Sequence, residues 1–589
     1  MAGNTVSLPY EEPGIALILV QASFVLLLNV VNSILDRLVY CGLLGQVLIG
    51  IAWGSPGAKW LSTRVEEVVV QLGYLGLILL VYEGGLSTSF TSLKANLLLS
   101  SAVALTGIGF PIALSYSLQG LVGATALQAF AAGAALCSTS LGTTFTVLNS
   151  SGLSNTRLGV VLSSAAMMDD VVGLVMVQVI SNLGAGNISP VTIVRPVLVS
   201  IAFAAIVPLI CYFTVKPLTL VLNSYREAHP SSKLHTVLCH GQTAFVIHTL
   251  LLIALVTGSS FAGTSNLFAA YIAGAVISWW DTELPHPTCP TEDKLEKCNE
   301  GTVNTTTGGD GIISKPSTDD ALGSENRTIT PSAPQNEKDG NPAGRHTSSQ
   351  ESETGPAIYE HYYQQAVSRI LQPFFFASIG FSIPITRMFS GSIIWRGIVY
   401  AILMTFGKMV CGLWLVRIPV SSKSNRLRGL GKKLRLRSIP HIWGKTAKIK
   451  PAKSTTSQEG ADDTTVTART NTVPECRPST STHSTPYPPK PFSIHPPLIM
   501  SLAMTARGEI GFLISAVAEA NGVFSSSSTS TFSKESDIFL IVTWAIVLCT
   551  MIGPLGVGLL VRRVKALEEK KEREMEGGGR DVLGVWGVQ

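Results

Sequence analysis

The stretch LGVVLSSAAMMDDVVGLVMVQVI, residues 158–180, is apolar except for two adjacent aspartates at its centre, Asp169 and Asp170. A carboxylate in the middle of a membrane-spanning helix costs roughly 2.5–3.5 kcal/mol on insertion scales. Two neighbouring carboxylates cost more, because their charges repel each other. A chain that keeps such a pair indicates that a cationic species visits it. The stretch therefore predicts a membrane helix that binds and moves small cations or protons.

The alternative for this stretch is a helix boundary at residues 168–170, with an aspartate as N-cap. That boundary would leave two pieces too short to cross a bilayer, so we expect one continuous helix. Adjacent residues on a helix lie about 100° apart around its axis. We therefore expect one aspartate to face a cation site and the other to face a neighbouring helix.

The rest of the chain is also typical of a membrane protein. Of its 589 residues 46% are hydrophobic and 14% are charged, and the mean hydropathy is +0.36. Long apolar runs recur, which predicts an all-α polytopic membrane protein. Hydropathy suggests about thirteen spans, near residues 13–35, 38–54, 64–86, 94–118, 122–149, 157–182, 192–216, 241–260, 262–280, 362–386, 392–417, 495–520 and 537–563.

The orientation follows from the basic loops, because cytoplasmic loops carry an excess of Lys and Arg. Residues 423–453 contain eleven basic residues and no acidic one. With thirteen spans this block lies on the same face as the basic 216–240 loop and the residues after the last span. The termini are then on opposite sides, the N-terminus outside or lumenal and the C-terminus cytoplasmic. Which membrane holds the protein, the plasma membrane or an endomembrane, stays open.

Two long polar segments divide the predicted membrane domain. They are poor in apolar residues and rich in Ser, Thr and Pro, so we expect disordered cytoplasmic loops. The basic block of the second loop could contact anionic lipid, or it could only set the topology. The resulting domains are the membrane parts 1–280, 362–417 and 495–563, the loops 281–361 and 418–494, and a cytoplasmic tail 564–589.

A buried carboxylate pair needs a counter-charge, and Lys408 in ILMTFGKMVCGLWLV is a lysine in the interior of a predicted span. Without a partner its ammonium group would be as costly in the membrane as the acids. We expect Lys408 to pair with one aspartate across helices. The alternative, a lysine whose side chain extends to the interface, requires a shallower position.

Two other segments place polar residues inside spans. AALCSTSLGTTFTVL, residues 134–148, is a hydroxyl-rich patch that indicates either an unwound helix, whose free carbonyls bind a cation, or a small-residue packing face. SLAMTARGEIGFLISAVAEA, residues 501–520, carries a charged and flexible point. Interrupted helices in the two halves of a chain indicate an inverted-repeat transporter. The candidate residues of these two segments are Ser138, Thr139, Ser140, Thr143, Arg507 and Glu509.

Glu83, in ILLVYEGGLSTSF, lies near the end of the third predicted span. It is a candidate proton-access or pH-sensing carboxylate. A structural acid at the membrane interface is the other interpretation.

Together these residues resemble the cation:proton antiporter superfamily, in the branch with monovalent cation:proton antiporters and Na⁺/H⁺ exchangers. The resemblance extends over residues 13–563 without the two loops. Order and spacing carry it, over the stretches LILLVYEGGLSTSF, CSTSLGTTFTVLNSSGLSNTRLGVVLSSAAMMDDVVGLV, SNLFAAYIAGAVIS, ILQPFFFASIGFSIPI, TFGKMVCG and AMTARGEIGFL. The long loops indicate a eukaryotic, more narrowly a fungal, relative.

The resemblance implies two inverted repeats with two discontinuous helices that cross, 122–149 and 495–520, and a homodimer. It implies that Asp170 is the main ion-binding carboxylate, and thus the ligand of a transported Na⁺. It also implies that Asp169 is the partner of Lys408. The double aspartate is similar to that of electrogenic Na⁺-type members. If Lys408 releases Asp169 and loses its proton when the cation arrives, the cycle is electrogenic.

The expected function is Na⁺ (or Li⁺)/H⁺ exchange by alternating access, with monovalent cations, protons and the lipid bilayer as partners. No cofactor and no nucleic-acid partner are expected. No nucleotide-binding loop occurs in the sequence, so we expect a secondary active transporter and no enzyme. Three alternatives stay open: a K⁺/H⁺ exchanger of the same fold, a sodium-coupled symporter and a non-transporting sensor.

Overall fold

The computed structural model consists of helices and their connections, with no strand in the part of the chain that it describes. The described residues are 12–39, 41–140, 142, 152–154, 156–184, 190–229, 232–238, 240–285, 354–416, 494–525, 536–574, 583 and 586. Most of loop 281–361, nearly all of loop 418–494, and Thr143 lie outside them, so our predictions for these parts remain predictions.

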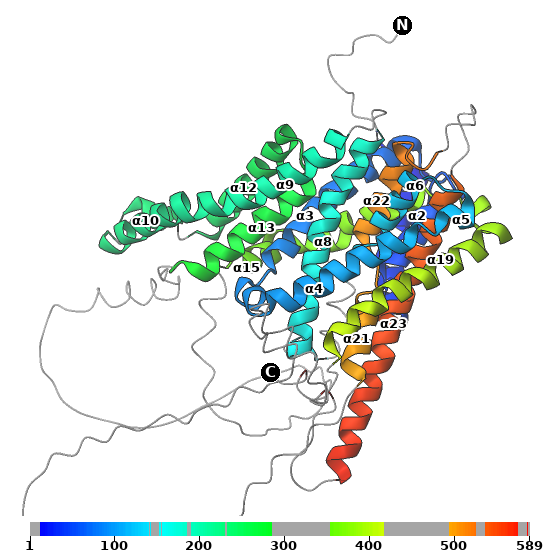
Figure 1. The fold of residues 1–589 in the computed structure, drawn as a ribbon. Coiled ribbons are helices and arrows are strands. Elements are labelled where there is room, and N and C mark those ends of the chain that lie inside the picture. Colours follow the sequence, from blue (N-terminus) through cyan, green and yellow to red (C-terminus); the bar gives the residue numbers. More distant parts are fainter. Residues whose placement is uncertain are drawn as a thin grey trace, which may run out of the picture.

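The helices form one bundle (Figure 1). Their bounds are α1 Ile15–Val39, α2 Leu43–Trp53, α3 Thr63–Leu86, α4 Phe90–Ser115, α5 Leu118–Val122, α6 Ala126–Ala135, α8 Arg157–Leu183, α9 Pro190–Ile210, η1 Cys211–Val215, α10 Lys216–Ala228, α11 Lys233–Leu238, α12 Gly241–Ala262, α13 Asn266–Glu283, α15 Gly355–Tyr362, α16 Gln364–Ala366, η3 Val367–Leu371, α17 Gln372–Phe381, α18 Ile385–Met388, α19 Gly391–Met409, η4 Val410–Leu415, α21 His495–Ala503, α22 Glu509–Ala520 and α23 Asp537–Glu574.

Eight helical segments of the described residues are long and apolar enough to cross a membrane, and α2 and α6 are shorter apolar helices. The all-α polytopic class is thereby confirmed, while the count of thirteen spans stays a prediction. The division between the eighth and ninth predicted spans is a real break. Helix α12 ends at Gly263, whose φ of +79° suits glycine, and Ser265 caps α13 by accepting a hydrogen bond from the Phe268 amide.

Two boundaries differ from the sequence prediction. Residues 355–361, which we assigned to the first loop, begin helix α15, where Ile358 and Tyr359 are buried against the bundle. Residues 564–574, which we assigned to the tail, continue α23, which projects beyond its neighbours in Figure 1. Hydropathy does not predict these two helical segments, because both are polar in composition. A short helix needs few apolar residues when only one face packs, and an exposed helical extension needs none.

Glycines allow two pairs of helices to approach at backbone distance. A Cβ added at Gly85 of α3 would collide with the Tyr271 carbonyl oxygen of α13, and one at Gly274 of α13 with the Tyr82 carbonyl oxygen of α3. Helices α2 and α17 meet in the same way at Gly50 and Gly380. Such small residues are typical of membrane helix interfaces, where close packing supplies the contact energy.

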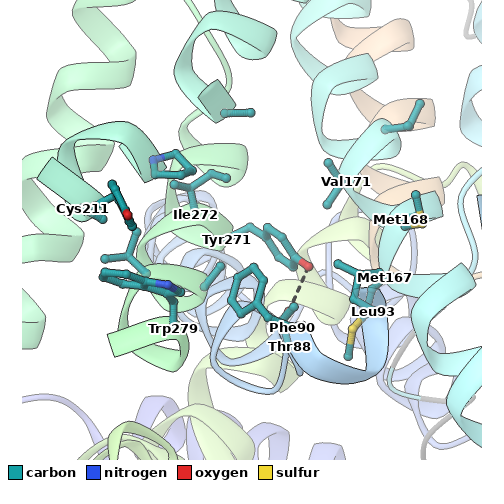
Figure 2. A pocket seen from close by; sticks show the side chains of 16 residues that line it. Thr88, Phe90, Leu93, Met167, Met168, Val171, Cys211, Tyr271, Ile272 and Trp279 are labelled. Atoms are coloured by element: carbon teal, nitrogen blue, oxygen red, sulfur yellow. Dashed lines mark hydrogen bonds between the residues drawn. The ribbon is translucent and has the colours of Figure 1, made fainter. Parts of the chain in front are cut away.

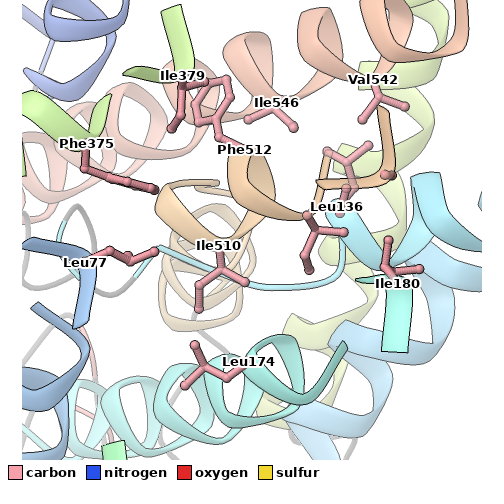
Figure 3. Close-up of a cluster of buried hydrophobic side chains, with 14 of the residues drawn as sticks. Leu77, Leu136, Leu174, Ile180, Phe375, Ile379, Ile510, Phe512, Val542 and Ile546 are labelled. Atoms are coloured by element: carbon pink, nitrogen blue, oxygen red, sulfur yellow. The ribbon is translucent and has the colours of Figure 1, made fainter. Parts of the chain in front are cut away.

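A large apolar cluster joins the two halves of the chain around the centre of the bundle. Figure 3 shows a part of it, in which side chains from α3, α8 and α17 meet those from α22 and α23. Leu136, directly after α6, and Ile510 and Phe512 of α22 are all less than 5% exposed. This packing holds the ends of α6 and α22 together and so positions the polar groups described next.

Candidate functional site

Helix α8 runs without interruption from Arg157 through both aspartates to Leu183. It begins where Thr156 accepts a hydrogen bond from the Gly159 amide, so the N-cap is thirteen residues before Asp169. The alternative of a helix boundary at residues 168–170 is therefore wrong. Asp169 is fully buried and Asp170 is 5% exposed, which leaves two carboxylates inside the bundle.

Opposite these aspartates, one helix of the bundle ends and another is broken. Helix α6 ends at Ala135, and residues 136–140 continue in a non-helical conformation. Helices α21 and α22 are separated by residues 504–508. The two breaks touch, because the Ser140 amide donates a hydrogen bond of 3.1 Å to the Ala506 carbonyl oxygen. The discontinuity of 495–520 is thus present, whereas 141 and 143–151 lie outside the described residues.

Lys408 of α19 reaches the broken end of α6 and pairs with Asp169. Its Nζ lies 2.6 Å from Asp169 Oδ2, 2.6 Å from the Cys137 carbonyl oxygen and 3.0 Å from Thr139 Oγ1. An ammonium group has three protons, so these three acceptors satisfy it. Lys408 and Asp169 are both 0% exposed, which makes this a fully buried ion pair.

Thr139 links the ion pair to the second broken helix. Its hydroxyl lies 2.5 Å from Asp169 Oδ2 and 3.2 Å from the Met504 carbonyl oxygen. The hydroxyl has one proton, so it donates to one of these oxygens at a time while it accepts from Lys408. The remaining oxygen of Asp169, Oδ1, has no hydrogen-bond partner among the described residues.

Arg507, in the break between α21 and α22, is fully buried and donates to the freed carbonyl groups after α6. Its Nη1 lies 2.6 Å from the Ser138 carbonyl oxygen and 3.4 Å from that of Cys137. The Thr550 hydroxyl in turn donates to the Arg507 carbonyl oxygen at 3.0 Å. The carbonyl groups that unwinding releases are therefore bound by two side-chain cations, Arg507 and Lys408.

Asp170 occupies a different environment from Asp169. Ser138 Oγ donates to Asp170 Oδ1 at 3.1 Å, and the carboxylate lies on the wall of a cavity of about 390 Å³. Ser140 and Glu509 line the same cavity, with the Ser140 hydroxyl 3.4 Å from Glu509 Oε2. Close approach requires Gly173 here, since a Cβ would lie 2.9 Å from that of Ser138.

The cavity reaches from Asp170 to the C-terminal ends of α1 and α3, where Asp36 and Glu83 line it. Glu83 is thus on the path between Asp170 and these helix ends. Several carboxylates on one narrow cavity attract cations and repel anions. Among the described residues no group of three or more His, Cys, Asp or Glu side chains could hold a metal ion.

Some members of this site carry no signal in the sequence. The acceptors at the carbonyl groups of Cys137 and Met504 are backbone atoms, which every residue type has. Asp36 and Tyr271, which also line the cavity, come from segments that looked like ordinary membrane helices. Asp36 could have been found as an acid near the end of an apolar run, as Glu83 was. Tyr271 could not.

Comparisons with known proteins find similarity to sodium/hydrogen exchangers and cation/proton antiporters. A family model described as "Sodium/hydrogen exchanger, transmembrane" matches residues 22–305. The chain is 30% identical over 266 residues to a "Probable Na(+)/H(+) antiporter GerT" of Bacillus cereus, over 44% of this chain and 64% of that protein. It is 30% identical over 243 residues to the "Na(+)/H(+)-K(+) antiporter GerN" of the same organism, over 41% of this chain and 58% of that protein.

A plant relative and a solved structure extend the comparison. The chain is 27% identical over 283 residues to "Cation/H(+) antiporter 17" of Arabidopsis thaliana, over 45% of this chain and 33% of that protein. The sodium proton antiporter MjNhaP1 of Methanocaldococcus jannaschii aligns at a TM-score of 0.48 and 12% identity, over 93% of this chain and 99% of that one. The chain spans less than two thirds of the length of each of these three sequence relatives. By the family model and these relatives, the chain is similar to sodium/hydrogen exchangers and cation:proton antiporters over its N-terminal membrane part.

Proposed function

We propose that this protein exchanges a monovalent cation, Na⁺ or Li⁺, for a proton, with Asp170 as the group that binds either one. The observation that carries the proposal is the unequal environment of the two aspartates. Asp169 is neutralised by Lys408 at 2.6 Å, whereas Asp170 faces a cavity and accepts one hydroxyl hydrogen bond. A buried carboxylate without a cationic partner is costly, so Asp170 gains most from a proton or a cation.

The charge balance of the buried charged groups in the candidate site supports a single bound cation or proton. Asp169, Asp170 and Glu509 are opposed by Lys408 and Arg507, and all five are at most 9% exposed. With every group ionised, one negative charge is in excess. One proton or one monovalent cation removes this excess, and both together would reverse it. The two ions therefore compete for the site, which is the condition for exchange.

The competition explains alternating transport in physical terms. When the site carries a proton or a cation, its net charge is zero and its movement against the surrounding helices costs little. When the site is empty, the excess charge opposes that movement. Ser138 holds one oxygen of Asp170 in place, and the cavity past Glu83 gives the cation a path lined with carboxylates. On the predicted orientation this path opens to the cytoplasm.

An intact Lys408–Asp169 pair makes the proposed exchange one for one and electroneutral. An electrogenic cycle requires the pair to separate and Lys408 to lose its proton. A homodimer, as the resemblance implies, remains part of the proposal. K⁺ is the second candidate substrate, because one relative is named as a Na(+)/H(+)-K(+) antiporter.

The experiment is exchange in vesicles that contain the purified protein. The vesicles are acid-loaded, and internal pH is followed while Na⁺, Li⁺ or K⁺ is added. We expect Na⁺ or Li⁺ to alkalinise the interior, and Asp170→Asn to abolish the response. Glu66→Gln is the matched control, because Glu66 is also a buried acid but binds Ser55 at the far end of α3.

Each outcome has a defined meaning. A response to K⁺ alone would replace Na⁺ by K⁺ as substrate. Equal responses of the wild type and Asp170→Asn would refute the assignment of Asp170. The same assay with a potential clamped by valinomycin and K⁺ tests charge movement: a rate that changes with the potential would show that the cycle is electrogenic.

A further inference from the structure

A second cavity, of about 600 Å³ (Figure 2), shares the lining residue Tyr271 with the cavity of the carboxylates. Met167, Met168 and Val171 of α8 form one wall, and Cys211 and Trp279 lie on the opposite side. Its size is within the range of protein sites for small ligands, roughly 300–1,000 Å³. The proposed function uses no residue of this cavity other than Tyr271.

The cavity is lined mostly by apolar side chains. Tyr271 and Thr88 supply hydroxyl groups to its wall, and these lie 2.9 Å apart and bind each other, as Figure 2 shows. Thr88 Oγ1 also lies 3.1 Å from the Gly84 carbonyl oxygen. A buried water needs about two to four polar partners, and the bonded hydroxyls of Tyr271 and Thr88 leave few of them at this end of the cavity. Its lining loses dispersion contacts unless hydrocarbon fills it.

The wall formed by α9 and η1 faces outward. Tyr212, which lines the cavity, is 59% exposed, and Phe213 beside it is 67% exposed. These are exposed aromatic side chains on a helix that is apolar enough to cross a membrane, so the surrounding solvent is lipid. The hydrocarbon that has access to the cavity is therefore an acyl chain of the bilayer.

Two lysines lie next to or against residues that line the cavity. Lys216 Nζ lies 5.5 Å from the centre of the Tyr212 ring. Lys94, which is exposed, follows the lining residue Leu93 in the first turn after the start of α4. Both are at the ends of membrane helices, where the phosphate groups of lipids lie, and basic residues there attract anionic lipids. The apolar cavity and the basic residues near it together suit a ligand that has a hydrocarbon chain and a negatively charged group.

We propose that this cavity binds one acyl chain of an anionic phospholipid, whose phosphate lies between Lys216 and Lys94. The chain fills the space behind Met167 and Met168, on the helix that carries both aspartates. It ends at the Tyr271–Thr88 hydrogen bond, which separates hydrocarbon from the carboxylate cavity. If α8 moves during exchange, the bound lipid sets how easily it does so. This last consequence rests on the proposed function; the binding itself does not.

The test measures binding without transport. The purified protein is placed in phosphatidylcholine nanodiscs that contain a trace of phosphatidylglycerol with a diazirine at mid-chain, and labelled peptides are identified after irradiation. We expect labels in residues 167–172 and 204–212. Phosphatidylcholine with the same diazirine chain is the lipid control and should label these peptides several-fold less.

Two pairs of variants locate the two parts of the lipid. Ala204→Trp fills the cavity from an exposed lining position, and Ala202→Trp adds the same volume at an exposed position of α9 that does not line it. Only the first should remove the label. Lys216→Gln should lower labelling about fivefold, the size of one basic residue's attraction to an anionic membrane, and Lys233→Gln should not.

Equal labelling by the two diazirine lipids, or equal labelling of Ala204→Trp and Ala202→Trp, would overturn the proposal. Size-exclusion profiles and thermal stability equal to those of the wild type ensure that a lost label is not a lost fold. Since no step requires exchange, a failed transport assay and a failed lipid assay are separate results.

Discussion

Replacing Lys408 by Met removes the ammonium group from the centre of the bundle and keeps most of the side-chain volume. Asp169 then stays buried with one remaining hydrogen bond, from Thr139, because its Oδ1 has no partner among the described residues. Removing one member of a buried ion pair costs about 3–5 kcal/mol, since the other charge is left uncompensated. We expect the free energy of unfolding of Lys408→Met to be lower than that of the wild type by an amount near the upper end of this range.

The opposite substitution, Asp169→Asn, should cost less. Lys408 keeps two acceptors, the Cys137 carbonyl oxygen and the Thr139 hydroxyl, and the asparagine oxygen can remain a third. We expect a loss of about 3 kcal/mol, at the lower end of the same range. The double variant has no buried charge at either position. It should be more stable than Lys408→Met alone, which requires a coupling energy between the two positions larger than the loss in Asp169→Asn.

The assay is thermal and denaturant unfolding of the purified variants in one detergent, followed by tryptophan fluorescence and by loss of the monodisperse size-exclusion peak. Because a membrane protein of this size need not unfold in two states, the order of the four proteins decides, and absolute energies do not. If the double variant is less stable than Lys408→Met, removing the uncompensated charge of Asp169 brings no gain and the reasoning is refuted.

Three further predictions use the same assay. Arg507→Leu leaves the Ser138 carbonyl oxygen without its donor and should cost about 1–3 kcal/mol; unchanged stability would contradict the role of the guanidinium group. Gly274→Leu forces α13 away from α3 and should lower the free energy of unfolding by at least about 1–3 kcal/mol. Gly258→Leu, where a Cβ would meet open space, should not lower it. Asp537→Asn breaks an exposed ion pair and should change stability by less than about 1 kcal/mol; a larger loss would show that the pair is desolvated.

The sequence by itself determined the features whose energy is local to a segment. Apolar length predicts a membrane helix, because the bilayer has a fixed thickness. A charge inside such a helix predicts a partner, because an isolated one is too costly. On these grounds Asp169, Asp170, Lys408, Arg507 and Glu509 could be selected without any structure. They are the five buried charged groups of the candidate site.

Only the tertiary structure decided which atoms meet. Lys408 donates to a backbone carbonyl of Cys137, and backbone carbonyls are the same in every residue type, so no sequence pattern marks them. The contact between the Ser140 amide and Ala506 joins positions more than three hundred residues apart. Tyr271 separates two cavities because α3 and α13 approach closely at their glycines. Contacts of this kind depend on where helices cross, and hydropathy contains no information about crossing points.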